Sequence, residues 1–352
     1  MTTILGIDLG KFKSVACIFD AETEKYGFET IPTDPESFRD LLVRTAPTSV
    51  LLETCTAAGR VHDLCRELGR ECRVVNPLGE AWQWKEVKRK TDRDDALKLV
   101  RMHRLGELPT VHVPSPEVRQ RRSLIEFRRR LIGQRTAICN RIRARFQARG
   151  LSLPPRHRAW TAPALAEWRK AYARPLSECA ATELWRGELD VDLTLLEALG
   201  AQVAAAEKAL DARAQADEEV KLLTTIPGVG PRTAEAVTVA VAAYLDDPRR
   251  FRTARQVSAD AGRVPRQFQS GESDRKGWIT EKGPAALRTL LVECAWQVRR
   301  YNAWGAEVVE RISRGQKGRV KSVALARKLL VRCWAMLRDG RARDPPPAAA
   351  GP

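Results

Sequence analysis

Four acidic side chains lie at positions where an isolated carboxylate is costly to fold around. Asp8 lies in a strand-like apolar run, and Glu53 ends another such run. Asp92 and Asp95 open a predicted helix. Burying an unpaired carboxylate costs several kcal/mol, and several acids that converge on one spot are best explained by cations that neutralise them. The pattern therefore indicates phosphodiester chemistry assisted by metal ions.

The hydrophobic periodicity of residues 1–113 predicts the elements that position these acids. Three strand-like runs come first, near 3–9, 13–20 and 25–31, and two more follow near 49–53 and 71–76. Helical patterns occur near 35–45, 56–69 and 93–106. This order predicts a meander joined to parallel crossovers, which is the order of the ribonuclease H fold. Asp92 and Asp95 are one helical turn apart and are expected to face the same way.

Two simpler interpretations of these acids stay open. Asp92 can cap a helix and Asp95 can interact with the helix dipole. The segment Gly6–Lys11 also looks like the first phosphate loop of actin-like ATPases and sugar kinases, although neither the second Asp-x-Gly loop nor the adenosine-site glycines of those folds is found. Asp94, between the two helix acids, is expected to face solvent.

Composition narrows the class of partner. The chain has 352 residues, enough for two or three domains, and a formal net charge of +17 that favours nucleic acid over a membrane surface. The sequence contains no run of about 18 apolar residues, so no membrane span is predicted. The N-terminus lacks the pattern of a signal peptide, so we expect a cytoplasmic protein. The eight cysteines form no C-x-x-C pair, which argues against a zinc site.

A long basic helix is predicted from Glu117 to Arg149, within a helical middle region at 114–220. Within that helix only Glu117 and Glu126 balance many arginines, which favours a phosphate-backbone surface over a solvated face. A second helical stretch, about 190–219, is expected to pair with it as an antiparallel coiled coil, an arrangement that often makes oligomers. The candidate nucleic-acid ligands of the first helix are Arg128, Arg129, Arg130, Arg141 and Arg145.

Residues 221–340 are predicted to form a third, mainly helical unit. The segment Ile226–Ala234 resembles a helix-hairpin-helix turn, in which Gly228 and Gly230 let backbone N–H groups approach a phosphate, although a plain Gly-Pro helix connection explains it too. A basic, loop-rich stretch follows at 262–283. It holds the candidate phosphate ligands Arg263, Arg266 and Lys276 and the candidate nucleophile Ser270, with Ser273 and Ser258 as alternatives. The tail 341–352 is expected to be disordered.

Together these segments resemble the DEDD transposases of insertion sequences, also described as bridge-RNA-guided serine recombinases. The resemblance covers nearly the whole chain. Its marks are Gly6–Asp8, Glu53–Gly59, Lys90–Ala96, the Pro-Gly-Val-Gly turn at 227–230, Arg263–Arg266 leading into Ser270-Gly271, Gly277–Gly283, and Leu287–Leu291. The chain departs from the family pattern at Ala57–Gly59 and at Ile279–Lys282, and neither departure removes a proposed catalytic group.

The resemblance implies a RuvC-like N-terminal domain, a coiled-coil middle and a C-terminal transposase domain with a catalytic serine. It implies that Asp8, Glu53, Asp92 and Asp95 form the DEDD tetrad, which is expected to hold one or two Mg²⁺ ions because Mg²⁺ prefers oxygen ligands. It also implies that Ser270 is the nucleophile. The implied partners are donor DNA, target DNA and a structured noncoding RNA, with a homo-oligomer, dimer or tetramer, whose protomers share active sites.

Two other function classes stay open. A metal-dependent junction-resolving nuclease would need the acids without Ser270. A catalytically decayed nucleic-acid-binding protein would keep the arginine-rich helix and bind DNA without cutting it.

Overall fold

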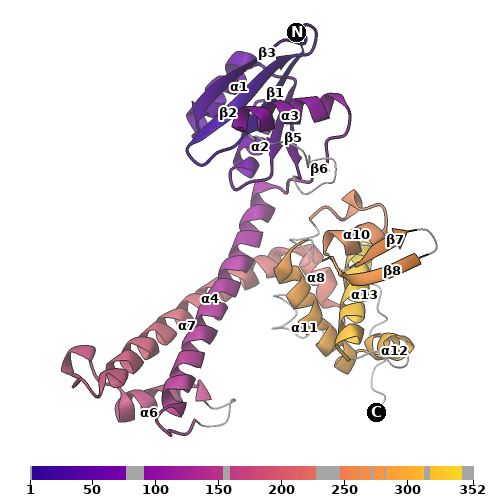
Figure 1. Cartoon of the computed structure of the whole chain (residues 1–352). Helices are drawn as coiled ribbons and strands as arrows, with labels where there is room; N and C mark the ends of the chain where they lie inside the picture. Colours follow the sequence, from indigo (N-terminus) through magenta and orange to yellow (C-terminus); the bar gives the residue numbers. More distant parts are fainter. Residues whose placement is uncertain are drawn as a thin grey trace. The chain divides into compact units, whose positions relative to one another are not determined.

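The computed structural model describes residues 2–76, 91–153, 159–226, 246–262, 264–270, 273–280, 283–312 and 318–342. The chain divides into two structural units, residues 1–117 and 118–352. Figure 1 shows a mixed sheet flanked by helices in the first unit and a mainly helical second unit. None of the helices in the described ranges is long and apolar enough to cross a membrane.

A six-stranded sheet in the order β3-β2-β1-β4-β5-β6 organises the first unit. β1, β2 and β3 form the predicted antiparallel meander, and β4 and β5 add to it in parallel with β1. The predicted order of strands and helices is therefore confirmed, and the short antiparallel strand β6 is an element that periodicity missed. The strands are β1 Thr3–Asp8, β2 Lys13–Asp20, β3 Tyr26–Pro32, β4 Ser49–Glu53, β5 Glu71–Val75 and β6 Thr110–Val111.

Helices cover both faces of this sheet. On one face α1 (Pro35–Thr45) and α2 (Ala58–Glu67) pack against Leu5, Ile7 and Leu52. On the other face α3 (Asp92–Arg104) packs against Ile4 and Leu51, among others. Because side chains alternate between the faces of a strand, the two cores assign every residue of β1 and β4 to a face.

Two helices pair side by side in the second unit. They are α4 (Pro116–Gln147) and α7 (Leu184–Ala216), and the shorter α6 (Ala162–Tyr172) packs on their far end. Arg121 contacts Asp217 near one end of the pair, and Arg145 contacts Glu188 near the other, so the helices run antiparallel. The two long helices were predicted, α7 beginning six residues earlier than expected. The helix α6 was not predicted.

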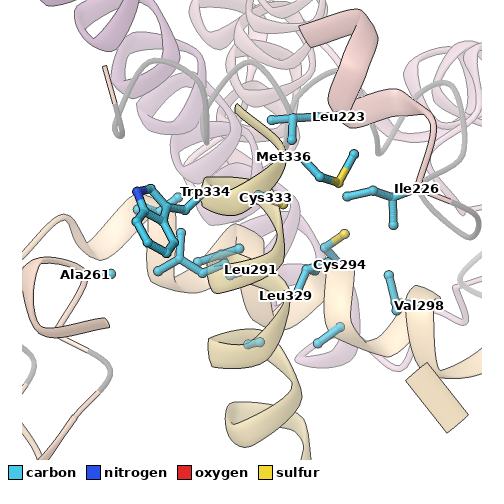
Figure 2. Close-up of a cluster of buried hydrophobic side chains, with 14 of the residues drawn as sticks. Leu223, Ile226, Ala261, Leu291, Cys294, Val298, Leu329, Cys333, Trp334 and Met336 are labelled. Carbon is cyan, nitrogen blue, oxygen red and sulfur yellow. The ribbon is translucent and has the colours of Figure 1, made fainter. Parts of the chain in front are cut away.

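Most of the remaining elements surround another apolar core, centred on α13 (Figure 2), whereas η2 packs on α7. Trp334 of α13 contributes to this core and donates its indole N–H to the carbonyl of Pro248 at 2.7 Å. The elements are η2 Leu176–Glu178, α8 Glu218–Thr224, η3 Pro248–Arg250, α10 Ala254–Asp260, β7 Pro265–Ser270, β8 Ser273–Ile279, α11 Ala285–Tyr301, α12 Ala303–Arg311 and α13 Gly318–Asp339.

The basic stretch that was expected to be loop-rich is a β-hairpin of β7 and β8, which corrects the prediction. Its strands are short and polar, without the apolar alternation that marks a half-buried strand. The amide of Thr280 donates to the carbonyl of Val264 at 2.9 Å and closes the base of the hairpin. The helix-hairpin-helix-like turn, from Pro227 on, and the tail from 343 on lie outside the described residues.

Candidate functional site

Asp8 and Glu53 lie at neighbouring strand ends. β1 and β4 are parallel and Ile7 pairs with Leu52, so the next residue of each strand is one of these acids. Ile7 and Leu52 pack toward α1 and α2, and strand alternation therefore places Asp8 and Glu53 on the opposite face, the one that α3 covers. Both acids are partly buried.

Gly6 allows α3 to approach this face very closely. A Cβ atom on Gly6 would lie 2.4 Å from the carbonyl oxygen of Ala96 and 2.9 Å from Cγ2 of Val100. Distances this short exclude any side chain at position 6 without a shift of α3. The glycine thereby brings Ala96, and the helix turn before it, against the strand that ends in Asp8.

The direction of α3 brings its first turn toward the same sheet edge. At its C-terminal end the Arg104 guanidinium lies 5.1 Å from the ring centre of Phe19, which pairs with Ile4 near the start of β1. Ala96 meets Gly6, near the end of β1. The helix therefore begins near the strand ends, with an exposed Asp92 and a partly buried Asp95 in its first turn.

Helix capping does not explain Asp92. The N-cap is Thr91, whose side chain accepts from the Asp94 amide at 3.3 Å. The Asp94 carboxylate accepts in return from the Thr91 hydroxyl at 2.6 Å and from its amide at 3.2 Å. Asp94 thus has the capping role, and the expectation that it only faces solvent is refined accordingly.

The chemistry of the four acids suits a hard divalent cation, because all their donor atoms are carboxylate oxygens. Among the described residues, however, no three His, Cys, Asp or Glu side chains are grouped closely enough to hold a metal ion. The strands and α3 therefore bring Asp8, Glu53, Asp92 and Asp95 to one face and one edge of the sheet without closing a metal site.

Three of the five candidate arginines of α4 have carboxylate partners on α7. Arg128 Nε donates to Glu207 at 2.9 Å, and Arg145 pairs with both Glu188 and Asp192. Arg141 also pairs with Asp192. Glu117 and Glu126 are the acids within this helix, and Glu188, Asp192 and Glu207 of α7 balance further arginines of α4. The antiparallel spacing of those acids along α7 is the signal that could have revealed the pairing.

Asp192 is the central acid of this helix pair. Burial acts to raise its pKa, but the hydrogen bonds and positive charges of Arg141 and Arg145 outweigh burial and lower it. Asp192 is only 6% exposed and Arg145 14%, so this network belongs to the helix–helix contact. Arg129 instead forms an exposed pair with Glu126 of the same helix, and Arg130 is exposed and forms no ion pair within the described part of the chain.

The backbones of Ser270 and Ser273 are register partners, where β7 ends and β8 begins. Lys276 lies on β8 opposite Gln267, next to Arg266 of β7. Arg263, Gly228 and Gly230 lie outside the described residues.

Ser258 is in a different setting from the two hairpin serines. It is fully buried in α10, where its hydroxyl donates to the Ala254 carbonyl at 2.9 Å and accepts from Arg327 at 3.2 Å. Those contacts give Ser258 a structural role and leave the two serines of the hairpin as the candidate nucleophiles.

Models of transposase families match residues in both structural units. A family model described as the IS116/IS110/IS902 transposase family matches residues 220–310, and another, described as a transposase, matches residues 5–148. A probable family 20 transposase of Pseudomonas aeruginosa is 33% identical over 85% of this chain and 86% of its own length. The transposase for insertion sequence element IS1111A of Coxiella burnetii is 28% identical over 82% of this chain and 77% of its own length.

Among solved structures, RuvC of T. thermophilus in complex with a Holliday junction substrate is similar to part of the chain. It covers 32% of this chain and 100% of its own, with 17% identity and a TM-score of 0.23.

Proposed function

Because this chain belongs to the IS116/IS110/IS902 family of transposases, we propose that it joins donor and target DNA by a metal-assisted attack of a serine on the phosphodiester. Transposition of an insertion sequence is the activity of the family. The serine nucleophile, the metal ion and a noncoding RNA that guides the protein to its DNA are what we propose in addition. The observation that carries it is the convergence of Asp8, Glu53 and the first turn of α3 on one face of the sheet in a transposase chain.

The acids have the role of binding the metal. Asp8 and Glu53 offer carboxylates from adjacent strand ends, and Asp92 and Asp95 offer two more from α3. Oxygen ligands of this kind suit one or two Mg²⁺ ions. Bound there, Mg²⁺ would neutralise charge on the scissile phosphate and on the departing oxygen. Gly6 keeps α3 against β1, so the first turn of the helix lies near the strand ends that carry Asp8 and Glu53.

Ser270 is the proposed nucleophile. Its Oγ attacks phosphorus, a P–O bond to serine forms, and the P–O bond to one DNA strand breaks. The seryl proton leaves and the departing strand oxygen gains a proton, so that strand ends in a hydroxyl. The hydroxyl of the exchanged partner strand then attacks the phosphoserine, reseals the DNA and returns the proton to serine. Because the bond energy is retained in the link, the exchange needs no ATP.

Basic groups near the hairpin would hold the DNA backbone. Arg263, Arg266 and Lys276 are proposed to contact the phosphate that is attacked. Gly228 and Gly230 are proposed to present backbone N–H groups to a neighbouring phosphate. Support for this comes from the hairpin register, which places the backbones of Arg266 and Lys276 near each other on adjacent strands, in the same hairpin as Ser270.

The proposed partners include a structured noncoding RNA that selects the DNA and further copies of this chain as a dimer or tetramer. The acids and Ser270 lie in different units, which is compatible with an active site shared between protomers. The α7 helix supports an oligomer, because Val191 and Leu195 are 48% and 45% exposed one helical turn apart. Large apolar side chains on one exposed helix face are typical of a helix–helix interface.

Replacing Ser270 by Ala tests the serine mechanism. We expect the protein–DNA covalent adduct, seen as a band shift in a denaturing gel, to disappear, whereas Ser273→Ala should keep it. DNA cleavage without an adduct in the wild type would instead indicate a metal-dependent nuclease, and binding without cleavage a decayed protein. Strand exchange that is equally efficient without the RNA transcribed beside the gene would exclude the guide.

A further inference from the structure

An exposed aromatic side chain, that of Phe12, lies four residues after Asp8, at which β1 ends. The loop from Leu9 to Phe12 joins β1 to β2 and follows Asp8 in the chain. The Phe12 ring at its tip is 75% exposed, more than the other large apolar side chains in the described residues. The loop therefore holds an aromatic ring in water a few residues from a proposed metal ligand.

The backbone of the loop that carries Phe12 is held by close contacts and hydrogen bonds. Gly10 makes the turn so tight that a Cβ atom there would lie 2.1 Å from the Lys13 carbonyl oxygen. The Phe12 carbonyl accepts a hydrogen bond from the Thr33 amide at 2.9 Å. The Thr33 hydroxyl in turn hydrogen-bonds at 2.8 Å with Ser14, which is fully buried. The backbone of Phe12 is thus fixed while its ring faces solvent.

Basic residues flank Phe12 in the chain, and one of them contacts its ring. The Lys11 ammonium lies 5.0 Å from the ring centre, and Lys13 on the other side of Phe12 is exposed. Arg60, at the start of α2, donates to the Thr33 carbonyl at 3.4 Å, so it reaches the residue that anchors Phe12. An exposed aromatic ring with an ammonium group beside it fits a nucleotide, whose base stacks and whose phosphate is anionic.

We propose that Phe12 is a stacking platform for an unpaired base of the DNA strand that enters the acidic edge. The inference rests on the proposed function and adds a substrate class to it: DNA that is melted or branched next to the scissile phosphate, and not intact duplex. In a duplex every base is stacked on its neighbours, and the Phe12 ring has no base face to contact. Lys11 and Lys13 hold the flanking phosphates.

The test is a binding titration of the full-length protein with fluorescent oligonucleotides, without divalent metal so that no strand is cut. The probes are a single-stranded DNA, the same sequence as a blunt duplex, and the same sequence as RNA. Phe12→Ala should weaken binding of the single strand by about tenfold or more, the effect of losing one base–aromatic stack, and change the duplex affinity less than twofold. Phe12→Trp should restore the affinity and Phe12→Leu should not.

Phe127→Ala is the matched control, because Phe127 is also an exposed phenylalanine, 42% exposed on α4. Equal losses for Phe12→Ala and Phe127→Ala, or equal losses on duplex and single strand, would overturn the platform. The stacking platform would also be overturned if Phe12→Ala lost affinity for the RNA probe alone, because Phe12 would then contact RNA. A change of oligomeric state in Phe12→Ala, seen by light scattering, would overturn it too, because Phe12 would then contact a second copy of the chain. The readout is binding alone, so failure of the serine or metal chemistry leaves its outcome unaffected.

Discussion

The acidic edge of the sheet and the α4–α7 helix pair both concentrate charge, but they differ in the sign of the groups that meet. At the sheet edge, two strands and a helix carry acids of the same sign to one face. In the helix pair, arginines of α4 meet acids of α7. Gathering like charges costs free energy and calls for an external cation, whereas opposite charges that meet within the fold stabilise it. The first arrangement indicates chemistry, and the second indicates architecture.

If an acid of the sheet edge served only the fold, the sheet edge and the helix pair would not differ in function. Asp8→Asn should reduce DNA cleavage and strand exchange by about a thousandfold, because several kcal/mol of transition-state stabilisation by the metal is lost. The melting temperature should not fall, since the change removes a charge from a group of acids. Cleavage is measured on a labelled DNA substrate with Mg²⁺, and melting by circular dichroism.

Asp94→Asn is the matched control for that experiment. Its carboxylate belongs to the capping box with Thr91, so the variant should lose about 1 kcal/mol of stability or less and keep cleavage. If both variants lost cleavage equally, the acids would serve to stabilise the start of α3 and not to bind a metal ion.

A substitution in the α4–α7 helix pair should lower the stability of the protein first, whereas a substitution of Asp8 should lower its activity. Asp192→Ala leaves Arg141 and the nearly buried Arg145 without their shared acid. We expect a loss of about 2–4 kcal/mol, less than the roughly 3–5 kcal/mol for breaking a buried pair, because Arg141 is half exposed and Arg145 keeps Glu188. Hydrogen exchange measured by mass spectrometry should show faster exchange in α4 and α7 and no change in the sheet.

The pH dependence of the same helix pair has a definite sign. The pKa of Asp192 is lowered in the fold, so its contribution is present above the ordinary Asp range, near pH 4, and is lost as pH falls through the lowered value. Wild-type α4 and α7 should therefore lose protection in acid, and Asp192→Ala should show less of this change. Protection that is unchanged by the substitution would mean that apolar packing alone holds the two helices together.

The sequence predicts those parts of the fold that depend on local patterns. Apolar alternation in β1 and β4 and the acid-rich start of α3 are visible residue by residue, so strand order and the placement of Asp8 and Glu53 followed correctly. The hairpin of β7 and β8 was missed because its strands are polar and gain stability from pairing with each other. The ion pairs of Arg145 join residues more than forty positions apart, and the role of Gly6 depends on a helix ninety positions away, so neither is encoded locally.

The smallest expected effect separates the arginines of α4 from one another. Arg130 is exposed, whereas Arg145 is 14% exposed and paired twice, so of these two arginines Arg130 can contact a DNA phosphate without breaking an internal contact. If Arg130 contacts a phosphate, Arg130→Ala should lower the slope of log K against log salt concentration by about 0.9 in duplex binding. Arg145→Ala should leave that slope unchanged and lower the melting temperature. An unchanged slope in Arg130→Ala would remove Arg130 from the nucleic-acid surface, and the arginines that pair with α7 would keep their structural role.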